Sequence, residues 1–448
     1  MKGAKGKDQV FSRHLTGKSA SEHLSNFNKL LADLMGSSEG KPEVLDDVTV
    51  IEISHANFPA LITASILGEF GAEVIKVEPP EGDPARTVSQ YGVNVDGAGI
   101  PFVMESRNKQ HITLDLKTEK GIENLKKLIT QADLVVDGMK PGFLDSLGVG
   151  YRQCAELKPG LVYLAVSPYG HFTTKGKAYS NIPDTDLTAQ SEAGYPALTG
   201  NPEAPEPYNY PVKAGVWAAS YMAAALAVAG ALTALLYKRK TGEGQMVDMA
   251  SYDAISAWQG YSTIWGVNFR KPRVRVGNFD WIIFPYGYYK AKDGFVTIAA
   301  GADQDFRGLL KIFKRWDLEN DWRFVFDRIT DDLDKLKLLE ADFKKEIVKF
   351  TRAELVQRTL SFSQKAARDK LRAQGSPIAV QTLSPREVLN EEHWKIRKSF
   401  MEFAVGETKI KMPAPAPKLS DTPLRLKKVE CGLGAHNRQV FQKFGLKE

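Results

Sequence analysis

Residues 208–254 carry a long helix between two other elements, and they read YNYPVKAGVWAASYMAAALAVAGALTALLYKRKTGEGQMVDMASYDA. A tight turn at Pro211-Val212 precedes an Ala-rich run. A basic turn, KRKTGEGQ at 238–245, follows that run, and MVDM at 246–249 resembles a strand. Residues 214–236 contain no charged side chain, so on length alone they could cross a bilayer. They are mostly Ala and Gly, which favours a helix packed closely on its neighbours inside a protein, so no membrane association is expected.

The first half of the chain predicts a parallel sheet. Apolar runs alternate with helical stretches, one ending at Phe70 and another over Lys120–Thr130. Alternation of this kind indicates βαβ units. No GxGxxG follows the first strand, so a nicotinamide or flavin cofactor is disfavoured. The expected strands are Val48–Ile53, Ala72–Val77, Ile112–Leu116, Leu134–Asp137 and Leu161–Val166.

The sequence changes character after residue 254. Residues 277–300 are aromatic and strand-like, and residues 303–374 predict charged amphipathic helices such as Leu336–Lys349. Residues 376–425 mix short strands and turns, and the Pro-rich segment 412–423 is expected to be extended because Pro fixes φ and lacks a donor. The chain length of 448 residues favours two domains. The expected parts are an extension at 1–44, a large α/β domain at 45–235, a small domain at 236–405 and a C-terminal segment at 406–448 that returns to the large domain.

Composition excludes several classes of function. Hydrophobic residues make up 43% and charged residues 25%, as in ordinary globular proteins. The net charge of +6 suits an anionic small ligand and is too low to indicate nucleic-acid binding. Cys154 and Cys431 are far apart, which argues against a disulfide scaffold or a zinc site. The basic N-terminus lacks the apolar core of a signal peptide, so a cytoplasmic protein is expected.

Several further motifs accompany the helix and its basic turn. They are GAEVIKVEPPEGDPAR at 71–86, RNKQHITLDLKT at 107–118, VDGMKPGFLDSLG at 136–148, PDTDLTAQ at 183–190, LSDTP at 419–423 and GLGAHN at 432–437. Through these motifs, the chain resembles the family III CoA-transferases over about residues 50–445. This family includes formyl-CoA transferase and carnitine CoA-transferase. The resemblance implies a Rossmann-like parallel-sheet large domain, a smaller α+β domain and an interlocked dimer. It also implies a coenzyme A thioester as substrate, without a metal or a permanently bound cofactor.

The resemblance assigns a set of ligand-binding residues. Arg86 follows a strand and a Pro-Gly turn, so it is expected at the carboxyl edge of the sheet, where a guanidinium suits a phosphate. A structural salt bridge is the alternative for Arg86. The LDLK part of the second motif is expected to line adenine and ribose. The implied binding residues are His55, Asn57, Arg86, Leu114, Asp115, Leu116, Lys117, Gly138, Met139 and Lys140.

The chain departs from the family pattern at several of these positions. Gly138 replaces a usual Asn, and Ser146 stands where an Arg often binds CoA, a charge that Lys140 could supply. Asn57 takes the place of a Gln that contacts the catalytic centre of formyl-CoA transferase. Ala435 replaces the Glu of the closing motif. These departures leave the strength of CoA binding open.

The largest departure concerns catalysis. In the family an Asp near the start of the Ala-rich helix attacks the thioester, giving an aspartyl anhydride and CoA thiolate, and this step needs a carboxylate. Residues 212–220 contain none. Three alignments place Ala214, Val216 or Ser220 at the position of the nucleophile. The fallback is Asp186, which starts a helix-like stretch and whose alternative role is helix capping.

Three functions remain compatible with these residues. We expect a non-catalytic subunit that pairs with a homologous, Asp-bearing subunit in a heterodimer or heterotetramer. An example is succinyl-CoA:(R)-benzylsuccinate CoA-transferase of anaerobic aromatic degradation. The aromatic run at 279–289 is compatible with an aromatic acceptor acid, although strand core explains it as well. The alternatives are an active homodimer that uses Asp186 or a shifted carboxylate, and a CoA-binding protein without transfer chemistry. A racemase is disfavoured because no His lies between His111 and His171.

Overall fold

The chain folds into two compact units in a computed structural model, which describes Lys29, Met35 and residues 37–178, 186–278, 280, 283–318, 333–368 and 377–447. As far as it is described, the larger unit comprises residues 29–195, 213–261 and 393–448. The smaller unit comprises residues 196–212 and 262–392. These units differ from the expected domains at residues 196–212, 236–261 and 393–405. Residues 236–261 belong to the larger unit because the strand after the basic turn joins its sheet. Most of the predicted 1–44 extension lies outside the described residues.

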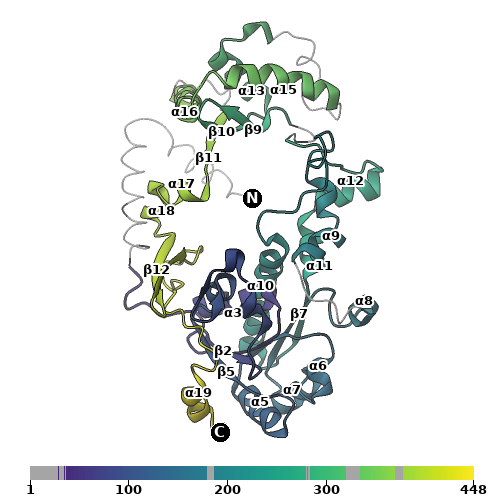
Figure 1. The fold of residues 1–448 in the computed structure, drawn as a ribbon, viewed down its shortest axis with the longest axis vertical. Helices are drawn as coiled ribbons and strands as arrows, with labels where there is room; N and C mark the ends of the chain where they lie inside the picture. The colour runs from purple at the N-terminus through teal and green to yellow at the C-terminus, as the bar shows by residue number, and fades with distance from the viewer. Residues whose placement is uncertain are drawn as a thin grey trace, which may run out of the picture. The chain divides into compact units, whose positions relative to one another are not determined.

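A six-stranded parallel sheet forms the centre of the larger unit, which confirms the predicted α/β class (Figure 1). Its order is β5-β2-β1-β6-β7-β8. The chain therefore starts at a central strand, winds outward to β5, and returns to the other side of β1. The strands are β1 (Thr49–Ser54), β2 (Glu73–Glu78), β5 (Lys109–Thr113), β6 (Leu134–Gly138), β7 (Val162–Ser167) and β8 (Met246–Ala250).

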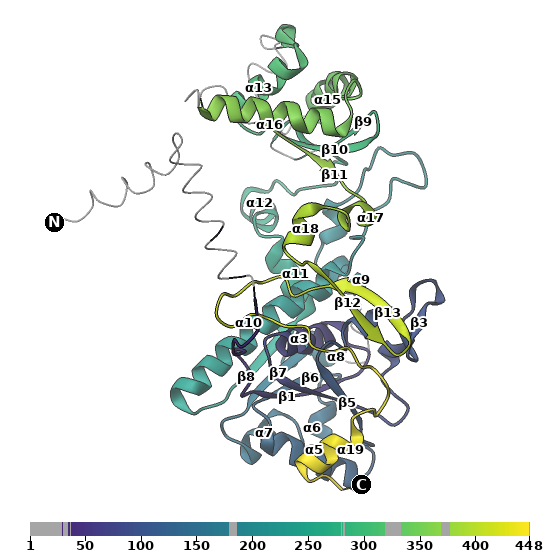
Figure 2. The same cartoon turned by 90° about the vertical axis from the view of Figure 1, so that its left-hand side faces the viewer.

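The two faces of this sheet are covered by different helices (Figure 2). Ile51 and alternate strand residues pack with α5 (Glu119–Gln131), α7 (Tyr151–Leu157) and α19 (Asn437–Phe444). Val50 and the intervening residues pack with α3 (Phe58–Glu69) and α10 (Ala218–Thr241). Because both faces are buried, the strands read as continuous apolar runs.

The Ala-rich helix α10 is long and apolar enough to cross a membrane, but it packs inside the larger unit. Ala223, Ala227 and Ala231 are fully buried against the sheet and α3. A Cβ on Gly230 would lie 2.9 Å from the Val247 side chain. Small residues therefore allow close helix packing here, as the sequence predicts. Gly242 ends the helix in the left-handed region, at φ 82°.

The strand that precedes the LDLK residues begins and ends earlier than predicted. The expected range was Ile112–Leu116, whereas β5 covers Lys109–Thr113. Lys109 is fully buried in a salt bridge with Glu52, with 2.7 Å between Nζ and Oε2. A charged residue inside the sheet does not fit the apolar pattern of a buried strand, so the sequence pattern did not predict that β5 begins at Lys109.

The C-terminal segment returns along the edge of the sheet at β5. Asn437 accepts a hydrogen bond from the Thr113 amide at 2.8 Å and donates one to its hydroxyl at 2.9 Å. Asn108 bonds the backbone of Arg425 and Lys427 at 2.7 Å each. The other elements of this unit are α4 (Ile100–Met104), α6 (Phe143–Ser146), α8 (Thr174–Ala178), α9 (Asp186–Glu192), α11 (Ser251–Trp258), the hairpins β3 (Asn94–Val95)–β4 (Ala98–Gly99) and β12 (Phe400–Val405)–β13 (Thr408–Pro413), and the short turns η1 (Pro84–Thr87) and η2 (Gln90–Gly92). Three elements contain residues of both units: the short turn η3 (Tyr195–Leu198) and the helices α12 (Tyr261–Phe269) and α18 (Glu392–Ile396).

The smaller unit is an antiparallel sheet covered by helices on one face. The sheet order is β11-β10-β9, and the core is rich in Phe, including Phe306 and Phe343. Within the predicted aromatic run, Phe284 and Tyr289 are buried, whereas Tyr286 and Tyr288 are exposed. Within the described part of this run, Phe284 and Tyr289 therefore belong to the core and Tyr286 and Tyr288 do not, and Phe279, Trp281 and Ile282 lie outside the described residues. The elements are β9 (Tyr286–Ala291), β10 (Gly294–Ala299), β11 (Ile378–Thr382), α13 (Asp303–Phe313), η4 (Trp316–Leu318), α15 (Leu333–Ile347), α16 (Arg352–Arg368) and α17 (Pro385–Val388).

Candidate ligand pocket

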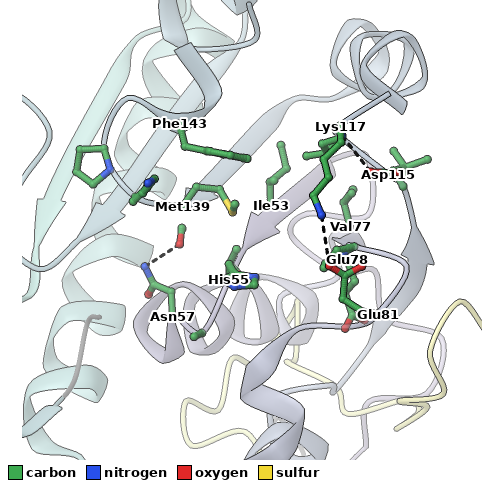
Figure 3. A pocket seen from close by; sticks show the side chains of 18 of the residues that line it. Ile53, His55, Asn57, Val77, Glu78, Glu81, Asp115, Lys117, Met139 and Phe143 are labelled. Atoms are coloured by element: carbon green, nitrogen blue, oxygen red, sulfur yellow. Dashed lines mark hydrogen bonds and ion pairs between the residues drawn. The ribbon is translucent and has the colours of Figure 1, made fainter. Parts of the chain in front are cut away.

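A pocket of about 540 Å³ lies at the carboxyl edge of the parallel sheet, within the larger unit (Figure 3). It lies where β1, β2 and β6 end, and where the chain leaves β5 and β7. The sheet order changes direction between β1 and β6, and open α/β sheets bind ligands at such a switch point. The volume is within the usual range for small-molecule sites. The lining residues are Ile53, Ser54, His55, Ala56, Asn57, Val77, Glu78, Pro79, Glu81, Leu114, Asp115, Leu116, Lys117, Gly138, Met139, Lys140, Pro141, Phe143 and Pro168.

The structure brings the predicted binding residues together, with one exception. His55 and Asn57 follow β1, residues 114–117 follow β5, and residues 138–140 follow β6. They are distant in sequence, but parallel strands end at the same edge. Arg86 is the predicted residue that does not line this pocket. The ligand-binding roles of these residues stay predictions.

Asn57 joins three segments beneath the pocket. Its side-chain oxygen accepts from the Ala60 amide at 3.0 Å and so caps the first turn of α3. Its amide group donates to the carbonyl oxygens of Gly138, at 3.2 Å, and Val166, at 2.9 Å. Both amide hydrogens are therefore used within the protein, and the side chain is buried. Its position fixes the ends of β6 and β7 relative to α3.

Gly138 has a steric reason to lack a side chain. A Cβ at this position would lie 2.6 Å from both the Ala60 and Ser54 Cβ atoms. Real Cβ atoms do not approach so closely, so β1 and α3 occupy the space that a side chain would need. The departure from the family's Asn therefore matches the local packing of this chain.

The wall contributed by residues 114–117 is a local turn. Asp115 accepts from the Lys117 amide at 3.0 Å, and Thr118 caps α5 by accepting from the Gly121 amide at 3.1 Å. The ammonium group of Lys117 lies 4.0 Å from the Glu81 carboxylate, and both side chains are exposed. An exposed pair at this distance adds little stability, so Lys117 remains available to an anionic ligand.

The pocket combines apolar walls with charged groups. Ile53, Val77, Met139 and Phe143 contribute apolar surface. Positive charge comes from Lys117 and Lys140, and negative charge from Glu78, Glu81 and Asp115. The apolar walls suit the apolar part of a ligand, and the two lysines suit an anionic part. No group of three His, Cys, Asp or Glu residues that could hold a metal ion occurs in the part of the chain that the structure describes.

Arg86 forms a buried structural salt bridge instead of a free phosphate-binding group. Its Nε lies 2.6 Å from Glu78 Oε2, its Nη2 lies 2.7 Å from Glu78 Oε1, and its Nη1 donates to the Cys431 carbonyl at 2.5 Å. The guanidinium also lies over the Phe102 ring, 4.4 Å from its centre. Only 8% of Arg86 is exposed. The geometry therefore supports the salt-bridge alternative.

Glu78 is held in its ionised form by this arrangement. Burial by itself would raise the pKa of Glu78, but hydrogen bonds from Arg86 and His111 hold it far below its usual range. Burial lowers the pKa of His111, and this effect outweighs the opposing effect of Glu78, which lies 2.8 Å away. The buried group is thus a charged Arg–Glu pair beside a neutral imidazole.

The fallback carboxylate, Asp186, caps α10 from a neighbouring helix. Asp186 begins α9, and its Oδ1 accepts from the backbone amide of Ser220 at 3.0 Å, in the first turn of α10. Its other oxygen accepts from Gln190, whose side-chain oxygen accepts from the Ala214 amide at 3.0 Å. Asp186 and Gln190 together hold residues 214–220, the stretch without a carboxylate. Asp186 does not line the pocket.

Several lining residues were not singled out from the sequence. Ile53 and Val77 end predicted strands, and Glu78 is the last residue of β2 in the structure. Pro79, Glu81, Pro141 and Pro168 lie in the turns that follow strands, and Phe143 begins α6. The available signal was their position directly after a strand of a parallel sheet. Residue type alone gave no indication, since most of them are apolar or Pro.

The fold is that of an α/β protein with a pocket at the switch point of a parallel sheet. The family model for CoA-transferase family III matches residues 45–437, and the chain belongs to this family. It is 30% identical over 410 residues to succinyl-CoA–D-citramalate CoA-transferase of Chloroflexus aurantiacus, covering 90% of this chain and 95% of that protein. The activity that family membership supports is CoA transfer.

Other relatives include both chains of a heteromeric enzyme. The succinyl-CoA–L-malate CoA-transferase of Chloroflexus aurantiacus has an alpha subunit that is 28% identical, over 95% of each chain. Its beta subunit is 29% identical, over 89% of this chain and 92% of that chain. A crystal structure of a CAIB/BAIF family protein from Brucella suis aligns with a TM-score of 0.73 and 27% identity, covering 90% of this chain and all of the other.

Proposed function

We propose that this chain is a subunit of a CoA-transferase that moves CoA from an acyl-CoA donor to a carboxylic acid, with succinyl-CoA as the favoured donor. Family membership and the pocket at the sheet edge support this proposal. Relatives at 28 to 32% identity include several succinyl-CoA-dependent transferases. The apolar walls suit the uncharged parts of coenzyme A, and Lys117 and Lys140 suit its phosphates.

The chain is proposed to be non-catalytic by itself. The observation that carries this step is the start of α10, where residues 212–220 hold no carboxylate. Asp186, which contacts this stretch, accepts hydrogen bonds from the Ser220 amide and from Gln190. An aspartyl anhydride cannot form without a carboxylate at the thioester. A homologous subunit is therefore proposed to supply the Asp, in a heterodimer or heterotetramer. The alpha and beta subunits of the malate enzyme are a precedent for two related chains.

The acceptor is proposed to be a dicarboxylic or aromatic acid, for which benzylsuccinate is one candidate. The acids in the names of the relatives, which include citramalate, malate and mesaconate, support a dicarboxylic acceptor. The aromatic residues at 279–289 support an aromatic acceptor. A panel of succinate analogues, including mesaconate, malate, glutarate and benzylsuccinate, would identify the acceptor by the rate of acyl-CoA formation.

The decisive experiment compares the purified chain with a co-purified homologous subunit. Succinyl-CoA and the acid panel are supplied, and CoA exchange is followed by chromatography. The lone chain is expected to bind coenzyme A by calorimetry and to transfer none, and the pair is expected to turn over. Replacing the Asp of the partner by Ala should abolish activity of the pair. Robust turnover by the lone chain would contradict the non-catalytic role.

A second candidate is an active homodimer in which Asp186 is the nucleophile. The specific observation in its favour is the position of Asp186, 3.0 Å from the amide of Ser220, one of the positions aligned with the family's Asp. Hydroxylamine added during turnover traps an aspartyl anhydride as a hydroxamate, which mass spectrometry locates. Modification of Asp186 would favour this candidate, and an unmodified chain would exclude it.

A further inference from the structure

A buried group of ions connects two walls of the pocket. Lys76 of β2 lies 2.8 Å from Asp83 and 3.3 Å from Glu52, and all three side chains are fully buried. Lys109 pairs with the other oxygen of Glu52 at 2.7 Å. The group thus contains two cations and two anions. Ions without solvent persist when they are paired and hydrogen-bonded in this way.

Asp83 also holds the turn that follows β1. Its Oδ1 accepts from the Ala56 amide at 2.8 Å and from the Ala85 amide at 2.9 Å. Ala56 has φ 53°, in the left-handed region that a residue with a Cβ rarely adopts. Such a conformation costs about 1 kcal/mol or more and persists only where its surroundings fix it. The Asp83 carboxylate accepts the hydrogen bond from the Ala56 amide and so helps to fix this conformation.

Lys76 secures the same turn from its other end. Its Nζ donates to the Ser54 hydroxyl at 2.8 Å and to the Ser54 carbonyl at 3.2 Å. Ser54, His55, Ala56 and Asn57 all line the pocket. Figure 3 shows His55 and Asn57 on this turn, with Glu78 and Glu81 on another wall. Asp83 follows that second wall directly, so the ion pair fixes the spacing of the two walls.

We propose that Asp83, clamped by Lys76, is a positioning residue that sets the 54–57 turn and thereby the affinity of the pocket for coenzyme A. This inference rests on the proposed CoA-binding function. Asp83 does not touch the ligand, since its carboxylate is buried and it does not line the pocket. It acts through the backbone of Ala56.

The test uses two variants that keep the interior electrically balanced. Lys76→Met/Asp83→Asn removes one cation and one anion but keeps an oxygen that can accept from Ala56. Lys76→Met/Asp83→Ala has the same charge and lacks that oxygen. Calorimetric titration of the full chain with coenzyme A is expected to give a dissociation constant about tenfold or more higher for the Ala variant than for the Asn variant. Equal affinities would overturn the inference.

A ligand-independent measurement separates this inference from the proposed function. Hydrogen exchange of a peptide that contains Ala56 is expected to be faster in the Ala variant than in the Asn variant. As a control, Ser384→Ala removes a helix cap in the smaller unit, where Ser384 accepts from the Glu387 amide at 3.3 Å, and should leave the affinity for coenzyme A unchanged. If the unmodified chain binds no coenzyme A, the proposed function and the ligand role of Asp83 both fail. Unchanged exchange at Ala56 would overturn only the claim that Asp83 holds the turn.

Discussion

Single residues of the pocket are fixed by packing that can be tested directly. A Cβ at Gly138 would lie 2.6 Å from two neighbouring side chains, so Gly138→Ala must displace α3 or β1. We expect a loss of about 1–3 kcal/mol in the free energy of unfolding, as for other overpacked positions, and weaker binding of coenzyme A. Urea denaturation and calorimetry measure the two effects. Gly215→Ala, where no atom lies within 4 Å of the added Cβ, is the matched control and should change neither.

Arg86 and Lys117 are expected to respond to substitution in opposite ways. Arg86→Met leaves the buried Glu78 carboxylate without its main partner, which should cost about 3–5 kcal/mol in the free energy of unfolding. Lys117→Met changes an exposed side chain and should cost less than about 0.5 kcal/mol, while weakening binding of coenzyme A. Urea denaturation measures the first effect, and calorimetric titration the second. A fully stable Arg86→Met protein that binds poorly would restore the phosphate-binding prediction for Arg86.

At the scale of elements, the start of α10 depends on a carboxylate from α9. Asp186→Ala removes the acceptor of the Ser220 amide and should destabilise the larger unit by about 1 kcal/mol, whereas Asp186→Asn keeps an acceptor and should cost less. Thermal unfolding measures both variants. If Asp186 is only a cap, the complex of Asp186→Asn with the homologous subunit should keep its turnover. A loss of turnover with normal stability would instead identify Asp186 as a nucleophile.

The elements differ in how well their sequence predicts them. The apolar runs of β1, β2, β6 and β7 are buried on both faces, so their patterns predicted the parallel sheet and its edge. The start of β5 was missed because Lys109 is buried through a salt bridge with Glu52, and a pairing partner 57 residues away is invisible in a local pattern. The role of Arg86 was open for the same reason. Whether the Arg86 guanidinium is paired depends on Glu78, Cys431 and Phe102, and these residues become its neighbours only in the folded chain.

At the scale of the whole molecule, family membership covers residues 45–437, but the pocket follows from topology. Segments from five parts of the chain meet at one edge because β1, β2, β5, β6 and β7 are parallel strands of one sheet. Sequence motifs therefore indicated which segments line the pocket. The buried ion pairs that hold these segments in place could not be predicted from the sequence, because the two residues of each pair lie on different strands or turns.

The pH dependence of stability tests the buried Glu78–His111 pair in the intact protein. The pKa of His111 is lowered by burial, so the folded state keeps it neutral while the unfolded chain takes up a proton below its ordinary pKa of 6.5. Its contribution is therefore lost as the pH falls below about 6.5, with a slope approaching about 1.4 kcal/mol per pH unit. The lowered pKa of Glu78 adds a further loss below its ordinary value of 4.5. Burial raises the pKa of Glu69 to about 7, which opposes this trend between about pH 7 and 4.5.

A comparison of variants isolates the His111 contribution from that of Glu69. His111→Gln removes the titrating imidazole and leaves Glu69 in place, so its free energy of unfolding should fall less between pH 6.5 and 4.5 than that of the unmodified chain. Urea denaturation at half-unit intervals of pH measures both slopes. Identical slopes would mean that His111 takes up its proton in the folded state as readily as in the unfolded chain. Below about pH 6.5 the buried Arg86–Glu78 pair would then have a charged imidazole beside it, and a neutral His111 in that pH range would be ruled out.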